Sequence, residues 1–96
     1  MKIVINDCYG GFTIPEEICL KKGILPYDEM DRSDPDLVAF VEEKGGSYRV
    51  NNYSRLVVID IPDDATDWMI VDNDGSEWVV YVIDGRLRSS LWKECD

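Results

Sequence analysis

The sequence predicts an α+β fold, a single domain over residues 1–96 in which two short helices pack on one face of a mostly antiparallel sheet of about four strands. Apolar runs rich in β-branched residues stand at 3–5 and 56–61, with helix-start signals between them. An Asp-Gly turn then joins two apolar segments. Because 45% of the 96 residues are hydrophobic and the composition does not shift along the chain, one modest core is expected.

The first predicted strand is the apolar run at residues 3–5. A helix over residues 14–22 follows it. Thr13 and Glu16 have the spacing of a capping box, in which the two side chains satisfy free backbone N–H groups at a helix start. Gly23 then supplies a C-terminal stop.

The second helix is predicted to begin at Ser33-Asp34-Pro35-Asp36, which offers a side-chain cap, a proline for the first turn and acids that favour the helix N-terminus. Apolar residues at 37, 38 and 41 would face the core, and the glycine pair at 45 and 46 would end the helix. Residues 47–55 are polar and predicted to form a loop, with a short edge strand at 48–50 as the alternative.

Two further predictions cover the C-terminal half. Residues 56–61 have the composition of an interior strand, which Pro62 ends, and a last strand is expected at 86–88. Segments 68–72 and 77–82 flank Asp74-Gly75 and predict a β-hairpin. No structure is assigned to the tail that follows residue 88.

The hairpin turn also predicts a register. If Asp74 and Gly75 are the two loop residues, Asp72 faces Glu77 across the strands. Facing carboxylates destabilise a hairpin, so we expect a cation, a basic partner or full solvation to relieve them. The same register places Trp68 and Tyr81 on one face, where their rings could pack together.

Charge is the most informative global property. The chain has 20 acidic and 10 basic residues, a formal net charge of −10, which argues against direct binding to nucleic acid or to an anionic membrane. From residue 56 to 85 there is no Lys or Arg, so this region is predicted to attract a basic protein, although acids also simply keep small domains soluble. The predicted partner-binding residues are Asp60, Asp63, Asp64, Asp67, Asp72, Asp74, Glu77 and Trp78.

Several chemistries are excluded by residue types. The chain has no histidine, the commonest general base and metal ligand, and its three cysteines form no Cys-x-x-Cys pair. We therefore expect reduced thiols, no enzymatic activity, no catalytic residues, no cofactor and no metal site. The Asp-rich hairpin turn also lacks the carboxylates that a calcium loop needs at its first and last positions.

The loop after the first predicted strand is an alternative binding site. Asn6, Asp7, Tyr9, Gly10 and Gly11 could bind a small polar ligand such as a nucleotide signal, or they could form only a structural turn into the first helix. Acids at and beyond this loop would repel a phosphate, which favours a base or a cationic ligand over an anion.

Several segments together resemble a family of small, acidic proteins of bacteriophages and prophages. The resemblance covers about two-thirds of the chain. It is carried by Lys2-Ile-Val-Ile-Asn-Asp-Cys-Tyr-Gly-Gly-Phe12, Asp34-Pro-Asp-Leu-Val38, Glu42-Glu43, Ile59-Asp-Ile-Pro-Asp-Asp64, Trp68, Ile70, Asp74-Gly75 and Glu77-Trp-Val79. Small, acidic, histidine-free phage proteins are often inhibitors that bind host or defence proteins, such as an immune nuclease, and by analogy with that class we expect an inhibitor here. With no apolar stretch of about 20 residues and no signal-peptide pattern, the expected location is the cytoplasm of the bacterial host.

Overall fold

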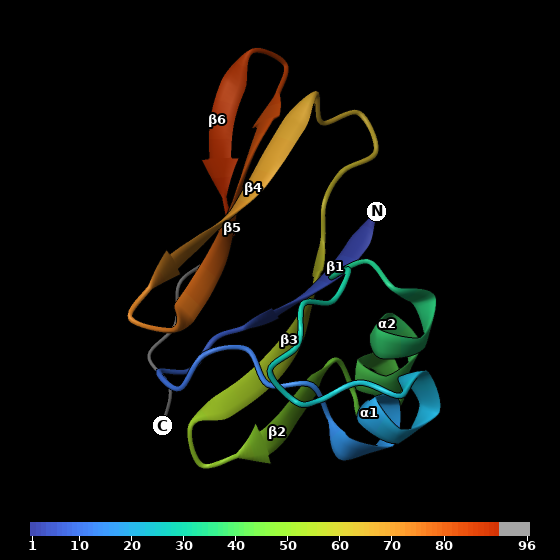
Figure 1. Cartoon of the computed structure of the whole chain (residues 1–96). Helices are drawn as coiled ribbons and strands as arrows, with labels where there is room; N and C mark the ends of the chain where they lie inside the picture. Colours follow the sequence, from blue (N-terminus) through green and yellow to red (C-terminus); the bar gives the residue numbers. More distant parts are fainter. Residues whose placement is uncertain (91–96) are drawn as a thin grey trace.

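The computed structural model describes residues 1–90 and confirms the α+β class (Figure 1). This part of the chain contains two helices and six strands, whereas about four strands were predicted. The strands form two antiparallel sheets instead of one. We call β1-β3-β2 sheet A and β4-β5-β6 sheet B. In chain order the elements are β1 Lys2–Asn6, α1 Glu16–Lys22, α2 Pro35–Glu43, β2 Ser47–Asn51, β3 Ser54–Asp60, β4 Asp67–Asn73, β5 Ser76–Ile83 and β6 Arg86–Ser89.

Sheet A is the middle layer of the molecule, with the two helices on one face and sheet B on the other (Figure 1). Alternation along β1 explains how one strand serves both layers. Val4 packs with Leu37 and Val41 of α2, whereas Ile3 and Ile5 face Val79 of sheet B. Both clusters are almost fully buried, so the hydrophobic effect holds the two sheets together as well as the helices.

The second helix begins as its sequence predicts and the first does not. The Asp34 carboxylate accepts hydrogen bonds from the backbone N–H groups of Asp36 and Leu37, a side-chain cap. The capping box at Thr13 is wrong, because α1 begins at Glu16 after an extended Pro15 and Thr13 lies too early to cap it. At the other end, Gly23 adopts the expected left-handed conformation, with φ 68°.

The loop predicted at residues 47–55 is instead a β-hairpin. The edge-strand alternative is confirmed and extended, since β2 runs from Ser47 to Asn51 and pairs with β3. The interior strand is also confirmed: β3 lies between β1 and β2 at the centre of sheet A.

The register of the β4–β5 hairpin is confirmed at every predicted pair. Asp74 and Gly75 are the loop residues, with φ 53° and 89°, and Asp72 pairs with Glu77. The last strand is present as β6, and the rest of the tail, including Trp92, lies outside the described residues.

Candidate protein-binding surface

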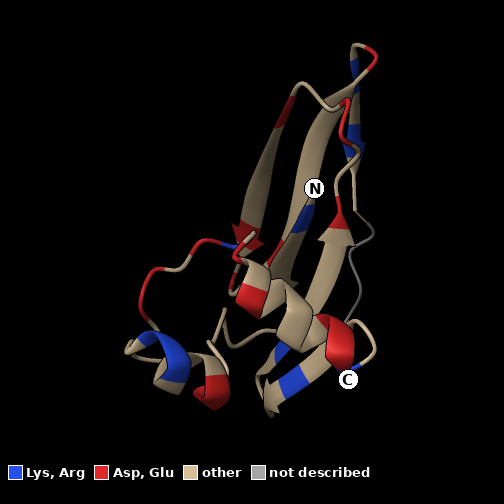
Figure 2. Cartoon of the chain, turned by 90° about the vertical axis from the view of Figure 1, so that its right-hand side faces the viewer, with Lys and Arg blue, Asp and Glu red and all other residues tan. Residues whose placement is uncertain are grey.

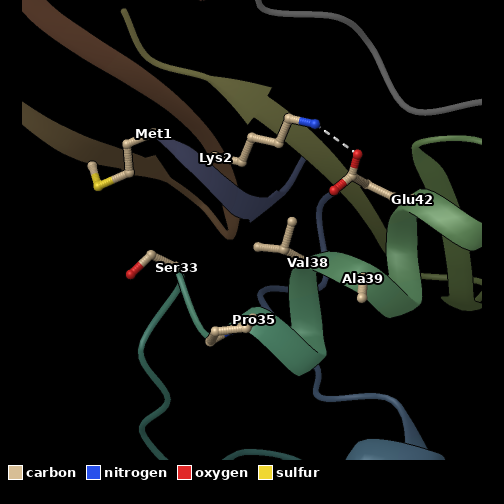
Figure 3. Close-up of a pocket in the computed structure, with 7 residues that line it drawn as sticks. All are labelled: Met1, Lys2, Ser33, Pro35, Val38, Ala39 and Glu42. Atoms are coloured by element: carbon tan, nitrogen blue, oxygen red, sulfur yellow. Dashed lines mark hydrogen bonds and ion pairs between the residues drawn. The ribbon is translucent and has the colours of Figure 1, made fainter. Parts of the chain in front are cut away.

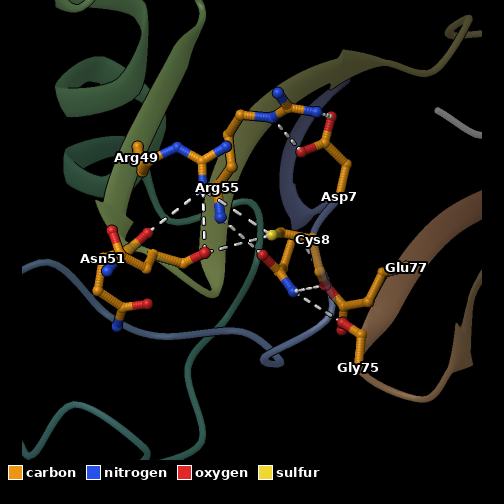
Figure 4. Close-up of polar contacts among 9 residues, drawn as sticks. Asp7, Cys8, Arg49, Asn51, Arg55, Gly75 and Glu77 are labelled. Atoms are coloured by element: carbon orange, nitrogen blue, oxygen red, sulfur yellow. Dashed lines mark hydrogen bonds and ion pairs between the residues drawn. The ribbon is translucent and has the colours of Figure 1, made fainter. Parts of the chain in front are cut away.

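Polar contacts of the loop after β1 connect sheet A to the β4–β5 turn of sheet B (Figure 4). Asn6 is fully buried, and its side-chain amide donates to the carbonyl oxygens of Cys8 at 2.6 Å and Gly75 at 2.7 Å. Its Oδ1 accepts from the backbone N–H of Arg55 at 2.9 Å. Because all of these polar atoms serve the fold, the structure argues against Asn6 as a ligand-binding residue.

The neighbouring loop residues are also engaged within the chain. Asp7 forms an ion pair with Arg55, with Arg55 Nε 2.7 Å from Asp7 Oδ1. The Gly10 N–H donates to the Tyr53 carbonyl at 2.6 Å, an approach so close that a Cβ on Gly10 would collide with Tyr53. Tyr9 remains 58% exposed, so of the side chains predicted at this loop it is the most accessible one.

The prediction that Glu77 belongs to an exposed acidic surface is wrong, because this side chain is only 6% exposed. Its carboxylate accepts from both terminal nitrogens of Arg32, at 2.7 and 2.9 Å, and from the backbone N–H of Asn6 at 2.8 Å. Arg32 in turn stacks over the Phe12 ring, 3.6 Å from its centre. A cation within the chain therefore relieves the Asp72–Glu77 pair, the first of the three predicted alternatives, and Glu77 is not available to a partner.

The remaining predicted acids fall into two separate groups. Asp60, Asp63, Asp64 and Asp67 surround the connection from β3 to β4, and all four are exposed; we call them the β3–β4 acidic group. Asp72 and Asp74 lie at the opposite end of β4, about 20 Å away for a strand of this length.

Trp78 also lies away from the β3–β4 acidic group. It pairs with Val71 near the Asp74-Gly75 end of the hairpin and is half-buried. The structure thus does not bring the predicted partner-binding residues together on one surface.

The N-terminal amine lies beside the β3–β4 acidic group. It donates to Asp63 Oδ1 at 2.8 Å and lies 3.6 Å from Asp60 Oδ1. The hydrogen bond to Asp63 raises the pKa of this amine above its ordinary value of 8.0 and lowers the pKa of Asp63 below 3.8. Asp63 is nevertheless 96% exposed and can contact a partner through its second oxygen.

A groove of about 550 Å³ adjoins this group between the start of β1 and α2 (Figure 3). Pro35, Val38 and Ala39 form an apolar wall on α2, and Met1 lies on the opposite side. The Lys2–Glu42 ion pair, at 2.8 Å, spans one end. A second hollow of about 270 Å³ runs from Met1 to Asp60 and Asp63, so apolar and acidic surfaces are continuous here.

Ion pairs place several basic residues beside acids outside the β3–β4 acidic group. A cation held beside one carboxylate offsets that carboxylate more than it offsets distant acids. Basic residues engaged in such pairs in the part of the chain that the structure describes include Lys2, Lys21, Lys22, Arg32 and Arg55. None of these pairs involves the β3–β4 acidic group. Figure 2 marks the acidic and basic positions along the chain.

The two cysteines in the described range differ. Cys19 is a free, buried thiol, and burial raises its pKa, as expected for a reduced structural cysteine. The expectation of a reduced thiol is wrong for Cys8, which is disulfide-bonded.

Residues 1–90 contain neither a metal-binding cluster nor a membrane-spanning helix. No group of three or more Cys, Asp or Glu side chains in this range is placed to hold a metal ion. The helices of the same range are too short and too polar to cross a membrane. No protein-family model, curated protein or solved structure matches the chain.

Proposed function

We propose that this protein is a small acidic interaction protein that binds a basic surface of a bacterial host or defence protein, such as an immune nuclease. The observation that carries the proposal is the β3–β4 acidic group beside the apolar groove. An apolar anchor surrounded by charge is a common composition of a protein-binding surface. The proposed activity is inhibition by binding, without catalysis, and the proposed location is the host cytoplasm.

Two observations support the direction of this proposal. The exposed carboxylates of the group would attract Lys and Arg of a partner and speed its association. The resemblance to small phage proteins supplies the class of partner. The disulfide at Cys8 argues against a cytoplasmic location, because disulfide bonds are rare in a reducing cytoplasm.

The test is affinity capture from a lysate of the bacterial host, followed by binding measurements with each captured protein. Asp63→Lys/Asp64→Lys is the test variant and Glu29→Lys/Glu43→Lys is the control, since all four residues are exposed acids and both variants change the net charge equally. We expect the test variant to lose at least tenfold in affinity, and the control to lose far less.

The salt dependence gives a second readout. Raising ionic strength from about 0.05 to 0.5 M should weaken the complex steeply, because screening shortens the reach of surface charges. The proposal would be contradicted if the affinity of the captured complex did not change with salt, or if both charge variants weakened the complex equally.

A further inference from the structure

β1 is an edge strand of sheet A, so one of its long sides has no neighbouring strand. Its odd-numbered residues bond to the chain of β3 on the other side. Met1 exchanges two backbone hydrogen bonds with Ile61, at 2.7 and 2.8 Å, and the alternation of an antiparallel ladder continues from there. The backbone groups of Lys2, Val4 and Asn6 therefore point away from β3.

Two of these three positions are already paired within the chain. The Val4 N–H donates to the Arg32 carbonyl at 2.9 Å, and Arg32 Nη1 lies 3.3 Å from the Val4 carbonyl oxygen. The Asn6 N–H donates to the Glu77 carboxylate at 2.8 Å. Within residues 1–90, neither the backbone N–H nor the carbonyl of Lys2 has such a partner. Lys2 therefore leaves the edge of sheet A open.

This open position lies at the apolar groove between β1 and α2 (Figure 3). Lys2 lines the groove opposite the wall formed by Pro35, Val38 and Ala39. Ser33, the residue after the one that pairs with β1, also lines it, and the chain then enters α2 at Pro35. The segment that covers the middle of the edge thus ends before it reaches Lys2, and unpaired backbone groups stand beside an apolar wall.

We propose that an extended basic peptide segment of the partner occupies this groove as an added strand and exchanges backbone hydrogen bonds with Lys2. Strand addition at an open sheet edge takes its affinity from main-chain hydrogen bonds and its specificity from pockets for side chains. One apolar side chain of the segment lies against the wall on α2. Lys or Arg side chains beside it reach Asp60 and Asp63 in the adjoining hollow.

The charges around the groove select a basic segment. Asp60 and Asp63 are exposed at one side, and the cation of Lys2 is already paired with Glu42 at 2.8 Å. An acidic segment would be repelled by these aspartates and by the net charge of −10. The inference rests on the proposed function, because it states which element of the basic partner binds and through which atoms.

The first experiment uses NMR of the full chain with a short acetylated peptide of alternating Arg and Val as the probe. Saturation with this peptide should slow amide hydrogen exchange at Lys2 about tenfold or more, because its N–H becomes paired. Exchange at Val4 should change little, since that N–H is already bonded. The control peptide has the same sequence but an N-methylated central Val, so it lacks the donor for the Lys2 carbonyl and should bind about fivefold more weakly.

A pair of variants tests the same hydrogen bond from the side of the protein. Lys2→Pro removes the open N–H and no bond of the fold, since proline is tolerated at the first residue of a strand. Lys2→Ala is the matched control, because both variants lose the ion pair with Glu42 and only Lys2→Pro loses the N–H. Mass spectrometry checks that both have the same N-terminus, and urea denaturation that both are equally stable. Lys2→Pro should bind the peptide about fivefold more weakly than Lys2→Ala.

Equal binding of the two peptides, unchanged exchange at Lys2, or equal binding by Lys2→Pro and Lys2→Ala would overturn this inference. The proposed function fails on a different measurement, which is an unchanged affinity of the captured partner for Asp63→Lys/Asp64→Lys. If that charge variant weakens the captured complex while Lys2→Pro and Lys2→Ala bind the partner equally, the acidic surface is retained and strand addition is refuted.

Discussion

The Arg32–Glu77 pair should be the most sensitive polar contact in the fold, because it connects sheet B to the segment that precedes α2. Glu77 accepts three hydrogen bonds, two from Arg32 and one from the Asn6 backbone. Glu77→Gln keeps the side-chain shape but can no longer neutralise Arg32 or accept both of its nitrogens. The variant leaves a half-buried guanidinium without its counter-charge.

The expected loss follows from the burial of the two partners. Removing one partner of a buried ion pair costs about 3–5 kcal/mol. Glu77 is 6% exposed but Arg32 is 21% exposed and can recover some hydration, so we expect the lower end, about 3 kcal/mol. For a domain of this size, each kcal/mol corresponds to about 4–8 °C in Tm, which gives a fall of roughly 12–24 °C.

Urea and thermal denaturation followed by tryptophan fluorescence would measure this change. Asp72→Asn is the control, because Asp72 is the exposed cross-strand neighbour of Glu77 and its loss should change stability by no more than about 0.5 kcal/mol. Arg32→Met/Glu77→Met removes both charges and should recover part of the loss. If Glu77→Gln were as mild as Asp72→Asn, the pair would not hold the sheets together.

Three further predictions concern the turn, the N-terminus and the buried thiol. Gly75→Ala should lower the free energy of unfolding, measured in urea, more than Gly85→Ala does. Both glycines have positive φ, but only at Gly75 would a Cβ collide with the Tyr9 carbonyl. Equal losses for the two variants would contradict this prediction. Asp63→Asn should lower Tm most between about pH 4 and 8. The contact between the N-terminal amine and Asp63 is lost when pH falls through the lowered pKa of Asp63 or rises through the raised pKa of the amine. A loss of Tm that does not depend on pH would refute this prediction. Cys19 should react with thiol reagents far more slowly in native protein than in urea, with Cys19→Ser as the control, and equal rates would show that the thiol is accessible.

Local signals in the sequence were enough to predict the elements whose partners are close in the chain. The β4–β5 register follows from Asp74-Gly75, because a two-residue turn fixes which residues face each other. The cap of α2 follows from Asp34, whose carboxylate accepts from backbone N–H groups within three residues. Both predictions concern contacts that the chain makes over short separations.

The division into two sheets could not be predicted in the same way. Residues 61–66 carry the chain from β3 to β4, and no residue type there states whether β4 pairs with β3 or begins a new sheet. The outcome depends on apolar burial of Val79 against Ile3 and Ile5, each of which lies more than 70 residues before it in the chain. The capping box predicted at Thr13 is wrong for a related reason. The Ile14 N–H donates a hydrogen bond to the Pro26 carbonyl, so residue 14 is not part of the helix.

Glu77 shows most clearly what the sequence contained and what it did not. On β5 it alternates in phase with Val79 and Tyr81, both of which pack toward sheet A, so period-2 alternation already placed this carboxylate on the inner face. Its partner Arg32 lies 45 residues away, and no spacing rule connects them. A one-residue slip of the β4–β5 register would turn Glu77 outward and leave Arg32 and the Asn6 N–H unpaired. We therefore expect the pair to fix the register of sheet B, and with it which residues of β4 and β5 face sheet A.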